Sequence, residues 1–324
     1  MKKPVNEHVL ALSGGVGGSK LAFGLSKLLS PDQLTILANT GDDFEHLGLT
    51  ICPDIDSLLY SLSETNNSEL GWGQKGETWN FLSALERLRG ETWFKLGDRD
   101  LATHVFRADK LKKGLSLTEV TKLLSNGMGS RHRILPMTDL PVRTMIHCEL
   151  GSLSFQNYFV KQRCEPKVNK ITFEGIELAS LNPSALNIIE QGLKAVIICP
   201  SNPFLSIDPI LSLGGVVEAI KKQGCPVIAV SNIIDGAATK GPAAKLMGEL
   251  GISSSPLGVA SYYQDRYPGL LTHFVLDEKD KNMERDIVSL GLSTLVAQTL
   301  MGSSGSKKRL AEDILTLASE ATLS

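Results

Sequence analysis

Cysteine is scarce in this 324-residue chain and forms no recognisable pattern. The five cysteines are odd in number, and no two of them form a Cys-x-x-Cys pair; they are Cys52, Cys148, Cys164, Cys199 and Cys225. This spacing argues against a structural zinc site and against the disulfide framework of a small secreted domain. We therefore expect a protein of a reducing compartment, the cytoplasm.

Net charge and long apolar runs are lacking as well. The formal net charge is −2, so no electrostatic argument favours nucleic acid or an anionic membrane as a partner. No apolar stretch is long enough to span a bilayer, and the first apolar run is too short for the core of a signal peptide. We expect neither nucleic acid nor a membrane among the partners.

A glycine-rich loop is the most informative feature that is present. An apolar run at residues 10–12 ends in Gly14, Gly15, Gly17 and Gly18, and an apolar helical pattern resumes after Lys20. Glycine lets the backbone approach a diphosphate closely, and the N-terminus of the following helix points free N–H groups at the anion. The loop therefore predicts a nucleotide site at the carboxyl edge of a sheet, although an ordinary strand–helix turn remains the alternative.

The loop fits neither of the two standard fingerprints. Counted from Gly14, the P-loop pattern would need glycine where Ser19 stands and a hydroxyl where Leu21 stands, so no side chain is placed to hold magnesium as in P-loop NTPases. The dinucleotide pattern starts at Gly15 and Gly17 but ends on Lys20. The loop thus predicts nucleotide binding but does not indicate which class of nucleotide is bound.

Acidic residues cluster shortly after the second predicted strand. Asp42, Asp43, Asp54 and Asp56 lie within fifteen residues. Mg²⁺ prefers one or two carboxylates together with substrate phosphates, so this cluster beside a phosphate loop predicts magnesium-assisted diphosphate chemistry. Alternatively, Asp54 or Asp56 merely caps a helix that begins at Ser57.

Alternating strand and helix patterns predict an α/β fold, a three-layer Rossmann-like and mostly parallel sheet with a small β-rich insert. Residues 8–141 and 182–302 are expected to form the core. Residues 142–181 alternate with a period of two around Gly151 and predict an insert that contains a β-hairpin. Residues 303–308 read as a polar linker before a last amphipathic helix, so 303–324 form a separate tail.

Other polar loops are predicted at the same sheet edge. Ser201 and Asn202 follow one predicted strand, and Gly241 precedes a helix whose first turn contains proline. Such groups could recognise a base edge, or they could be ordinary α/β turns. Residues 94–104 combine Lys95 with two acids, an arginine and a histidine around one glycine, and the alternative there is a solvated charged turn in which an aspartate caps a helix.

Taken together, these motifs resemble the CofD family, the 2-phospho-L-lactate transferases of coenzyme F420 biosynthesis. The matching segments are residues 13–21 (the glycine loop), 39–43 (Asn-Thr-Gly-Asp-Asp), 53–56 (Pro-Asp-Ile-Asp), 96–100 (Leu-Gly-Asp-Arg-Asp), 134–137, 200–203, 241–247 and 258–265. They run in order along nearly the whole chain. The segments at 96–100 and 53–56 are specific, whereas the glycine loop is not.

The resemblance implies a substrate pair and a cofactor. The family moves a phosphorylated C3 acid from a guanosine-diphosphate adduct to Fo, the deazaflavin 7,8-didemethyl-8-hydroxy-5-deazariboflavin, and releases GMP. It implies a core that binds nucleotide and deazaflavin, a homodimer, and Mg²⁺ held by Asp43, Asp54 and Asp56. Asp56 and Lys95 would contact Fo, whereas the glycine loop with Lys20, the Ser201–Asn202 loop and the Gly241 loop would hold the guanine nucleotide.

The implied mechanism is an in-line attack by the terminal ribityl hydroxyl of Fo on the phosphorus that bears the acid. Asp56 and Asp43 are the candidate catalytic residues, and Asp56 would orient the hydroxyl, accept its proton or hold the metal. No Ser/His/Asp or Cys/His set is spaced for a covalent intermediate. On this view Asp56→Asn lowers turnover by a few orders of magnitude and leaves the fold intact.

Two other functions are compatible with parts of the pattern. The related YvcK-like factors share a glycine loop and an acidic element but bind sugar nucleotides without known turnover, and the segment at 97–104 argues against them. A Rossmann oxidoreductase would need a third fingerprint glycine where Lys20 stands and an acid closing the second strand. Whether the C3 acid is lactate, enolpyruvate or glycerate stays open, because these differ by one or two atoms.

Overall fold

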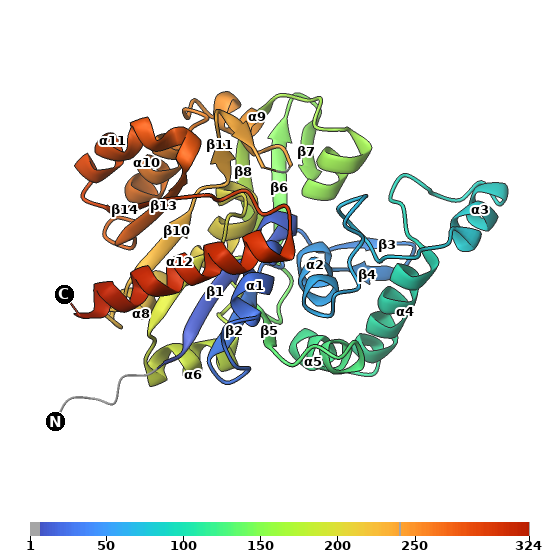
Figure 1. Ribbon diagram of the computed structural model, residues 1–324. Helices are drawn as coiled ribbons and strands as arrows, with labels where there is room; N and C mark the ends of the chain where they lie inside the picture. Colours follow the sequence, from blue (N-terminus) through green and yellow to red (C-terminus); the bar gives the residue numbers. More distant parts are fainter. Residues whose placement is uncertain (1–6, 240, 324) are drawn as a thin grey trace.

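A sheet of seven parallel strands forms the centre of the computed structural model, which describes residues 7–239 and 241–323 (Figure 1). The order across the sheet is β14-β13-β10-β9-β1-β2-β5. These strands are β1 (Val9–Ser13), β2 (Leu34–Ala38), β5 (Arg133–Pro136), β9 (Ala195–Ile198), β10 (Val227–Val230), β13 (His273–Asp277) and β14 (Ser293–Ala297). The predicted Rossmann-like α/β fold is confirmed.

Helices cover both faces of this sheet and make three layers. Successive residues of β1 point to opposite faces, so Leu10 and Leu12 join one core cluster while Val9 and Ala11 join the other. The first cluster includes side chains of α6 (Pro183–Gln191), α7 (Asp208–Leu211), α8 (Val216–Lys221), α9 (Ala243–Glu249), α10 (Pro256–Arg266) and α11 (Glu284–Ser289). The second includes side chains of α1 (Gly15–Ser26), α2 (Pro53–Leu62), α5 (Leu117–Gly127) and α12 (Ser304–Leu323).

The strand order reverses next to β1. From β1 the chain proceeds to β2 and β5 on one side, and it later returns to place β9 on the other side. The loops after β1 and β9 therefore diverge from a common point at the carboxyl edge. Such a reversal is where open α/β sheets leave a crevice for ligands.

Residues 142–181 form a small antiparallel sheet above this edge (Figure 1). Strand β6 (Arg143–Cys148) pairs with β7 (Gly151–Ser154) in the predicted hairpin and with β8 (Val168–Glu174) on its other side. A π-helical turn, η1 (Asn157–Lys161), joins β7 to β8. The hairpin prediction is confirmed.

A second excursion lies between β2 and β5. It contains the short hairpin β3 (Phe44–His46) and β4 (Leu49–Ile51), then α2, α3 (Asn80–Arg87), α4 (Asp98–Lys112) and α5. Residues 63–112, which include α3 and α4, are called the arm below, and Figure 1 shows α3 at its end, far from the central sheet. Helix α2 begins at Pro53 instead of Ser57, because proline at the first helical position has its backbone already set for a helix.

The C-terminal segment differs from the predicted linker. Helix α12 starts at Ser304, where the Ser303 side chain caps it by accepting a hydrogen bond from the main-chain N–H of Ser306 at 3.1 Å. The buried Leu310 and Ala311 pack into the cluster that also contains α1. The prediction of a linker at residues 303–308 is therefore wrong, because a serine cap and a buried helix face stabilise α12 from its first residues. Among the described residues, none of the helices is long and apolar enough to cross a bilayer.

Candidate functional site

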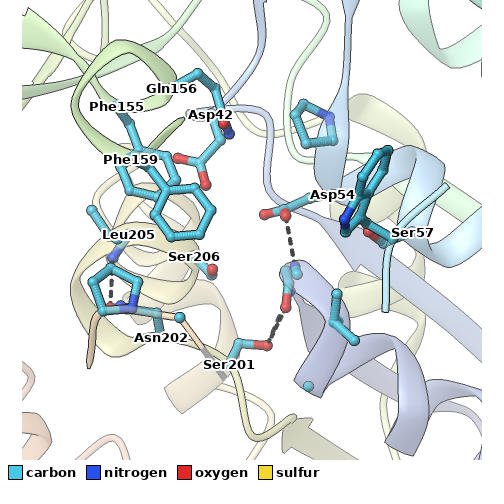
Figure 2. A pocket seen from close by; sticks show the side chains of 18 of the residues that line it. Asp42, Asp54, Ser57, Phe155, Gln156, Phe159, Ser201, Asn202, Leu205 and Ser206 are labelled. Carbon is cyan, nitrogen blue, oxygen red and sulfur yellow. Dashed lines mark hydrogen bonds between the residues drawn. The ribbon is translucent and has the colours of Figure 1, made fainter. Parts of the chain in front are cut away.

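A cavity of about 650 Å³ opens where the strand order reverses. The glycine loop after β1 and the first turn of α2 line it, together with the loops after β9 and β10. The arm contributes residues 71–72 and 93–95, and the insert contributes residues between 155 and 163. Figure 2 shows Asp42, Asp54, Phe159 and Ser206 facing one common space. Segments distant in sequence thus converge on one site.

The glycine loop has no room for side chains at the positions where it bends. Gly15 has φ +63°, in the left-handed region that favours glycine. A Cβ on Gly14 would lie 2.5 Å from Asp54 Oδ2, and one on Gly17 would collide with the carbonyl oxygen of Pro200. Gly14, Gly15 and Gly17 line the cavity, and α1 begins at Gly15 with its N-terminus toward it.

Asp54 ties this loop to the acidic segment. Its Oδ1 accepts a hydrogen bond from the main-chain N–H of Gly15 at 2.6 Å, and its Oδ2 accepts one from Asn39 Nδ2 at 2.9 Å. Asn39 also donates to the carbonyl oxygen of Leu205 at 3.1 Å and accepts from the N–H of Gly41 at 2.8 Å. The hypothesis that Asp54 caps its own helix is therefore wrong, because its carboxylate instead holds the N-terminus of α1.

Burial keeps several carboxyls of this region from ionising easily. Burial, followed by repulsion from Asp54 and Asp43, raises the pKa of Asp42 well above its usual value. Burial also raises the pKa of Asp54 to about 6 and that of Asp43 to about 8. Hydrogen bonds from Asn39 and Gly15 moderate the rise at Asp54. Burial therefore disfavours the ionised form of all three carboxyls.

The burial of Asp43 predicts a pH-dependent stability. The pKa of Asp43 is higher in the folded than in the unfolded chain, so the folded chain binds more protons between about pH 4 and pH 8 and loses stability as the pH rises through that window. We expect Asp43→Asn to flatten the loss between pH 5 and pH 8, by up to about 1.4 kcal/mol per pH unit. Urea unfolding at pH 5 and at pH 8 measures the free energy of unfolding of the wild type, of Asp43→Asn and of Asp265→Asn, an exposed control. Equal pH slopes in all three proteins would contradict it.

Asp56 faces a different set of partners. Both of its oxygens pair with the guanidinium of Arg107, through Nη2 and, at 3.2 Å, through Nη1, and both side chains are buried. Burial alone would lower the pKa of Arg107, but the Asp56 carboxylate raises it above its usual value. Asp56 is not among the residues that line the cavity. Its carboxylate is engaged in an internal ion pair.

This ion pair belongs to a buried polar network between α2 and α4. Arg107 Nη1 also lies 3.0 Å from His104 Nδ1 and donates to the carbonyl oxygen of Thr50 at 3.2 Å. His104 Nε2 lies 3.3 Å from Asp100 Oδ1, which accepts a hydrogen bond from the Tyr60 hydroxyl at 2.5 Å. The conspicuous charged segment at residues 96–107 thus fastens the arm to the first turns of α2.

The first acid of that segment has a structural role as well. Asp98 accepts hydrogen bonds from the main-chain N–H groups of Asn80 at 3.2 Å and Phe81 at 3.0 Å, so it caps α3. Hydrogen bonds from Thr78, Phe81 and Asn80 lower its pKa to about 2. Neither Asp98 nor Asp100 caps α4, which begins after Gly97.

The other predicted residues divide into two groups. Ser201, Asn202, Gly241 and Lys95 line the main cavity. Gly18, Lys20 and Asp43 do not line it, and Lys20 instead lines a smaller adjacent cavity of about 130 Å³. The structure thus brings the glycine loop together with Asp54, Lys95 and three of the polar loop residues, and it sets Asp43 and Asp56 apart.

Two polar side chains in the cavity have unused hydrogen-bonding groups. The Ser201 hydroxyl donates its hydrogen bond to the carbonyl oxygen of Gly14 at 2.8 Å, so this donor is already used within the glycine loop. Asn202 uses its oxygen on the N–H groups of Phe204 and Leu205, but its buried Nδ2 has no partner among the described residues. The buried Oδ1 of Asn232 is also unpartnered there. A donor and an acceptor are therefore left for a ligand.

Two aromatic walls of the cavity escaped the sequence analysis. Phe155 and Phe159 of the insert stack with ring centroids 5.3 Å apart, and Phe159 is 38% exposed. Trp72, Trp93 and Phe94 come from the arm. The spacing of Phe155 and Phe159, four residues apart, is the one signal that could have indicated a shared face. Such rings bind a flat, partly apolar ring system.

The carboxylates that line the cavity fit a divalent cation. Asp42 and Asp54 line the cavity, and the buried Oδ1 of Asp42 has no partner among the described residues. A cation between two such carboxylates would favour their ionised forms, which burial disfavours. In the described part of the chain no three His, Cys, Asp or Glu side chains are grouped to hold a metal unaided. Mg²⁺ needs no more than one or two carboxylates if substrate phosphates complete its shell.

Comparisons with known proteins agree on one family. The model of the family "2-phospho-L-lactate transferase CofD" matches residues 9–291. A 2-phospho-L-lactate transferase of Methanosarcina mazei is 40% identical over 95% of this chain and 99% of its own. A phosphoenolpyruvate transferase of Streptomyces coelicolor is 33% identical over 97% of this chain and 98% of its own.

A solved structure supports the fold alone. A member of the UPF0052 family from Bacillus halodurans superimposes with a TM-score of 0.65 and covers 97% of this chain and 99% of its own, but it is only 15% identical. The family assignment rests on the matched length and on the sequence identity to the transferases. This chain belongs to the CofD family of 2-phospho-L-lactate transferases.

Proposed function

We propose that the cavity binds a guanosine-diphosphate adduct of a phosphorylated C3 acid beside Fo, and that the protein joins the acid-bearing phosphoryl group to Fo. Membership of the family makes the chain a transferase of a 2-phospholactyl or phosphoenolpyruvyl group in F420 biosynthesis. The observation that carries the proposal is the convergence of the glycine loop, two carboxylates and two aromatic walls on one cavity. The cytoplasmic location and the homodimer are part of the same proposal.

The glycine loop and the loops after β9 and β10 are proposed to hold the donor. The N-terminus of α1 and the main-chain N–H groups of the loop favour a diphosphate. Asn202 Nδ2 and Asn232 Oδ1 supply the unused donor and acceptor that a guanine edge requires. Gly241 lines the same side of the cavity.

Close backbone approach at Gly17 gives a test of this donor site. We expect Gly17→Ala to weaken GDP binding by about tenfold or more, because a new Cβ meets the Pro200 carbonyl and such overpacking costs about 1–3 kcal/mol. Gly127→Ala on α5 is the matched control, since its Cβ would meet nothing within 4 Å. Isothermal titration with GDP measures both variants. Unchanged GDP affinity in Gly17→Ala would remove the glycine loop from the donor site.

The aromatic walls and Lys95 are proposed to hold the acceptor. The stacked rings of Phe155 and Phe159 and the arm residues Trp72 and Trp93 suit the flat deazaflavin of Fo. Lys95 lines the cavity beside Trp93 and can contact a polar edge of that ring system. The contact that the family resemblance assigns to Asp56 is not supported, because its carboxylate is paired with Arg107.

Asp42 and Asp54 are proposed as the carboxylates that hold Mg²⁺. When bound there, the ion would neutralise charge that develops on the diphosphate. Asp54 is fixed by Gly15 and Asn39, whereas Asp42 keeps an unpartnered oxygen among the described residues. Asp43 stays behind them, next to Cys52, and does not line the cavity.

The reaction then divides between these residues. Lys95 and the aromatic walls place the ribityl chain so that its terminal hydroxyl faces the acid-bearing phosphorus. The hydroxyl oxygen forms the new P–O bond, the bond to the GMP phosphate oxygen breaks, and GMP leaves. The hydroxyl proton is taken up by the departing GMP phosphate, so the step balances without a protein base. The backbone N–H groups of the glycine loop hold the leaving phosphate.

Transfer itself is the deciding test. The protein is incubated with Fo, Mg²⁺ and, in turn, the guanylyl-activated forms of 2-phospholactate, phosphoenolpyruvate and phosphoglycerate, and the products are identified by mass. We expect one acid to give a phosphodiester of Fo together with GMP. Thermal shifts with GDP and with UDP-sugars run in parallel. Stabilisation by UDP-sugars alone, without product from any donor, would favour a regulatory nucleotide-sugar protein and overturn the proposal.

A further inference from the structure

Arg163 lines the cavity but belongs to none of the motifs described above and has no role in the proposed reaction. The cavity lining contains only two basic side chains within residues 7–239 and 241–323, Lys95 on the arm and Arg163 on the insert. Arg163 is exposed at the cavity mouth, and its side chain makes no hydrogen bond or ion pair with any described residue. Its guanidinium is therefore free to meet a ligand.

The turn that carries Arg163 is held in an unusual conformation. Arg163 has φ +51° and Cys164 has φ +58°, two successive left-handed residues that are not glycine. Such residues cost about 1–3 kcal/mol each and persist where the surroundings enforce them. Here the main-chain N–H of Cys164 donates to the carbonyl oxygen of Tyr158 at 3.0 Å, and the fully buried Tyr158 anchors the turn. These contacts hold the backbone from which the Arg163 side chain extends.

A clamp on α9 holds this turn to the donor side of the cavity. Lys245 Nζ donates to the Tyr158 hydroxyl at 3.1 Å and to the carbonyl oxygen of Pro166 at 3.0 Å, and it pairs with Glu249 at 2.6 Å. Glu249 in turn accepts a hydrogen bond from the N–H of Val168 at 3.0 Å. Helix α9 follows directly on Gly241 and Pro242, which line the cavity. Arg163 and the Gly241 loop thus belong to one braced unit.

We propose that Arg163 binds an oxyanion of the guanylylated donor and so acts as a specificity-determining residue for it. The planar fork of arginine matches a carboxylate or a phosphate with two parallel hydrogen bonds. The donor carries such oxygens on its diphosphate and on the carboxylate of the C3 acid. Arg163 supplies a positive charge on the braced wall that can pair with these anionic groups. This inference rests on the proposed function, which supplies the donor.

The test compares Arg163→Gln with Arg163→Lys and with Lys161→Gln, which removes an exposed charge of the same turn that does not line the cavity. We expect Arg163→Gln to raise the KM of the donor by about tenfold, as for one lost charge-assisted hydrogen bond of about 1.5 kcal/mol, with the KM of Fo unchanged. Arg163→Lys should recover part of the loss, because it keeps the charge without the fork. Lys161→Gln should match the wild type.

Direct binding separates the two sources of the oxyanion. If Arg163→Gln weakens GDP about tenfold in calorimetry but leaves GMP unchanged, the arginine binds the diphosphate. If GDP binding is unchanged and only the donor KM rises, it binds the carboxylate of the acid. Unchanged donor KM and GDP affinity, a rise in the KM of Fo instead, or an equal effect of Lys161→Gln would overturn the inference. A wild-type protein that binds GDP without transfer would refute the proposed function alone, since the GDP arm still tests Arg163.

Discussion

Arg107→Met is expected to lower the free energy of unfolding by about 3–5 kcal/mol, the cost of leaving one buried charge without its partner. Arg107 is fully buried and pairs with both oxygens of Asp56. Its removal leaves the Asp56 carboxylate buried without its ion-pair partner and deprives the Thr50 carbonyl of a donor. The methionine side chain fills much of the volume, so the loss reports charge and hydrogen bonds more than a cavity.

Chemical denaturation followed by circular dichroism measures this effect. Lys112→Met on the same helix is the matched control, because Lys112 is exposed and should change stability by less than about 0.5 kcal/mol. A double variant with Asp56→Leu and Arg107→Met is expected to be more stable than Arg107→Met alone, since an apolar pair replaces the orphaned charge. Stability of Arg107→Met close to that of the wild type would show that the network contributes little.

The same network changes what an Asp56 variant would mean. From sequence, Asp56→Asn is expected to lower turnover by a few orders of magnitude with an intact fold. In the structure it leaves the guanidinium of Arg107 buried and unbalanced, so the fold is expected to weaken first. Loss of activity in that variant would therefore not identify Asp56 as a catalytic residue. Asp54 and Asp42, which line the cavity, are the informative positions.

The sequence predicted the elements whose causes are local. Buried strands such as β9 and β10 are continuous apolar runs, so nearby residues decide them. Strand β14 was missed because it is an edge strand without a continuous apolar run. The start of α12 was missed because its polar first turn is stabilised by a cap and by packing on α1.

The sequence predicted only those parts of the site that contiguous motifs form. The glycine loop and the acidic cluster are contiguous motifs, and both lie at the carboxyl edge of the sheet. Which carboxylate faces the cavity depends on a partner 51 residues away, the arginine that pairs with Asp56. The aromatic walls and Arg163 come from the arm and the insert, whose positions no local pattern specifies. Long-range pairing thus decides roles that spacing leaves open.

Asp54→Asn is expected to lower kcat by two to three orders of magnitude, about the loss that follows removal of one preorganised electrostatic contact in an active site. Asp54 is the cavity carboxylate that holds the N-terminus of α1 through Gly15 and the acidic segment through Asn39. An amide cannot accept hydrogen bonds from both sides, and it removes the negative charge proposed to hold Mg²⁺ beside the diphosphate. Steady-state transfer with saturating Fo and donor measures the change.

Binding distinguishes this effect from simple misfolding. Without a divalent cation, Asp54→Asn should bind GDP at least as tightly as the wild type, because the variant loses a charge that repels the diphosphate. Asp280→Asn is the control, since Asp280 is a buried carboxylate that binds the main-chain N–H of Asp235 and does not line the cavity. A wild-type kcat in Asp54→Asn would refute the role of this carboxylate. Lost GDP binding would show instead that Asp54 acts by holding the glycine loop in shape, because only a deformed loop fails to bind a nucleotide once the repulsion is gone.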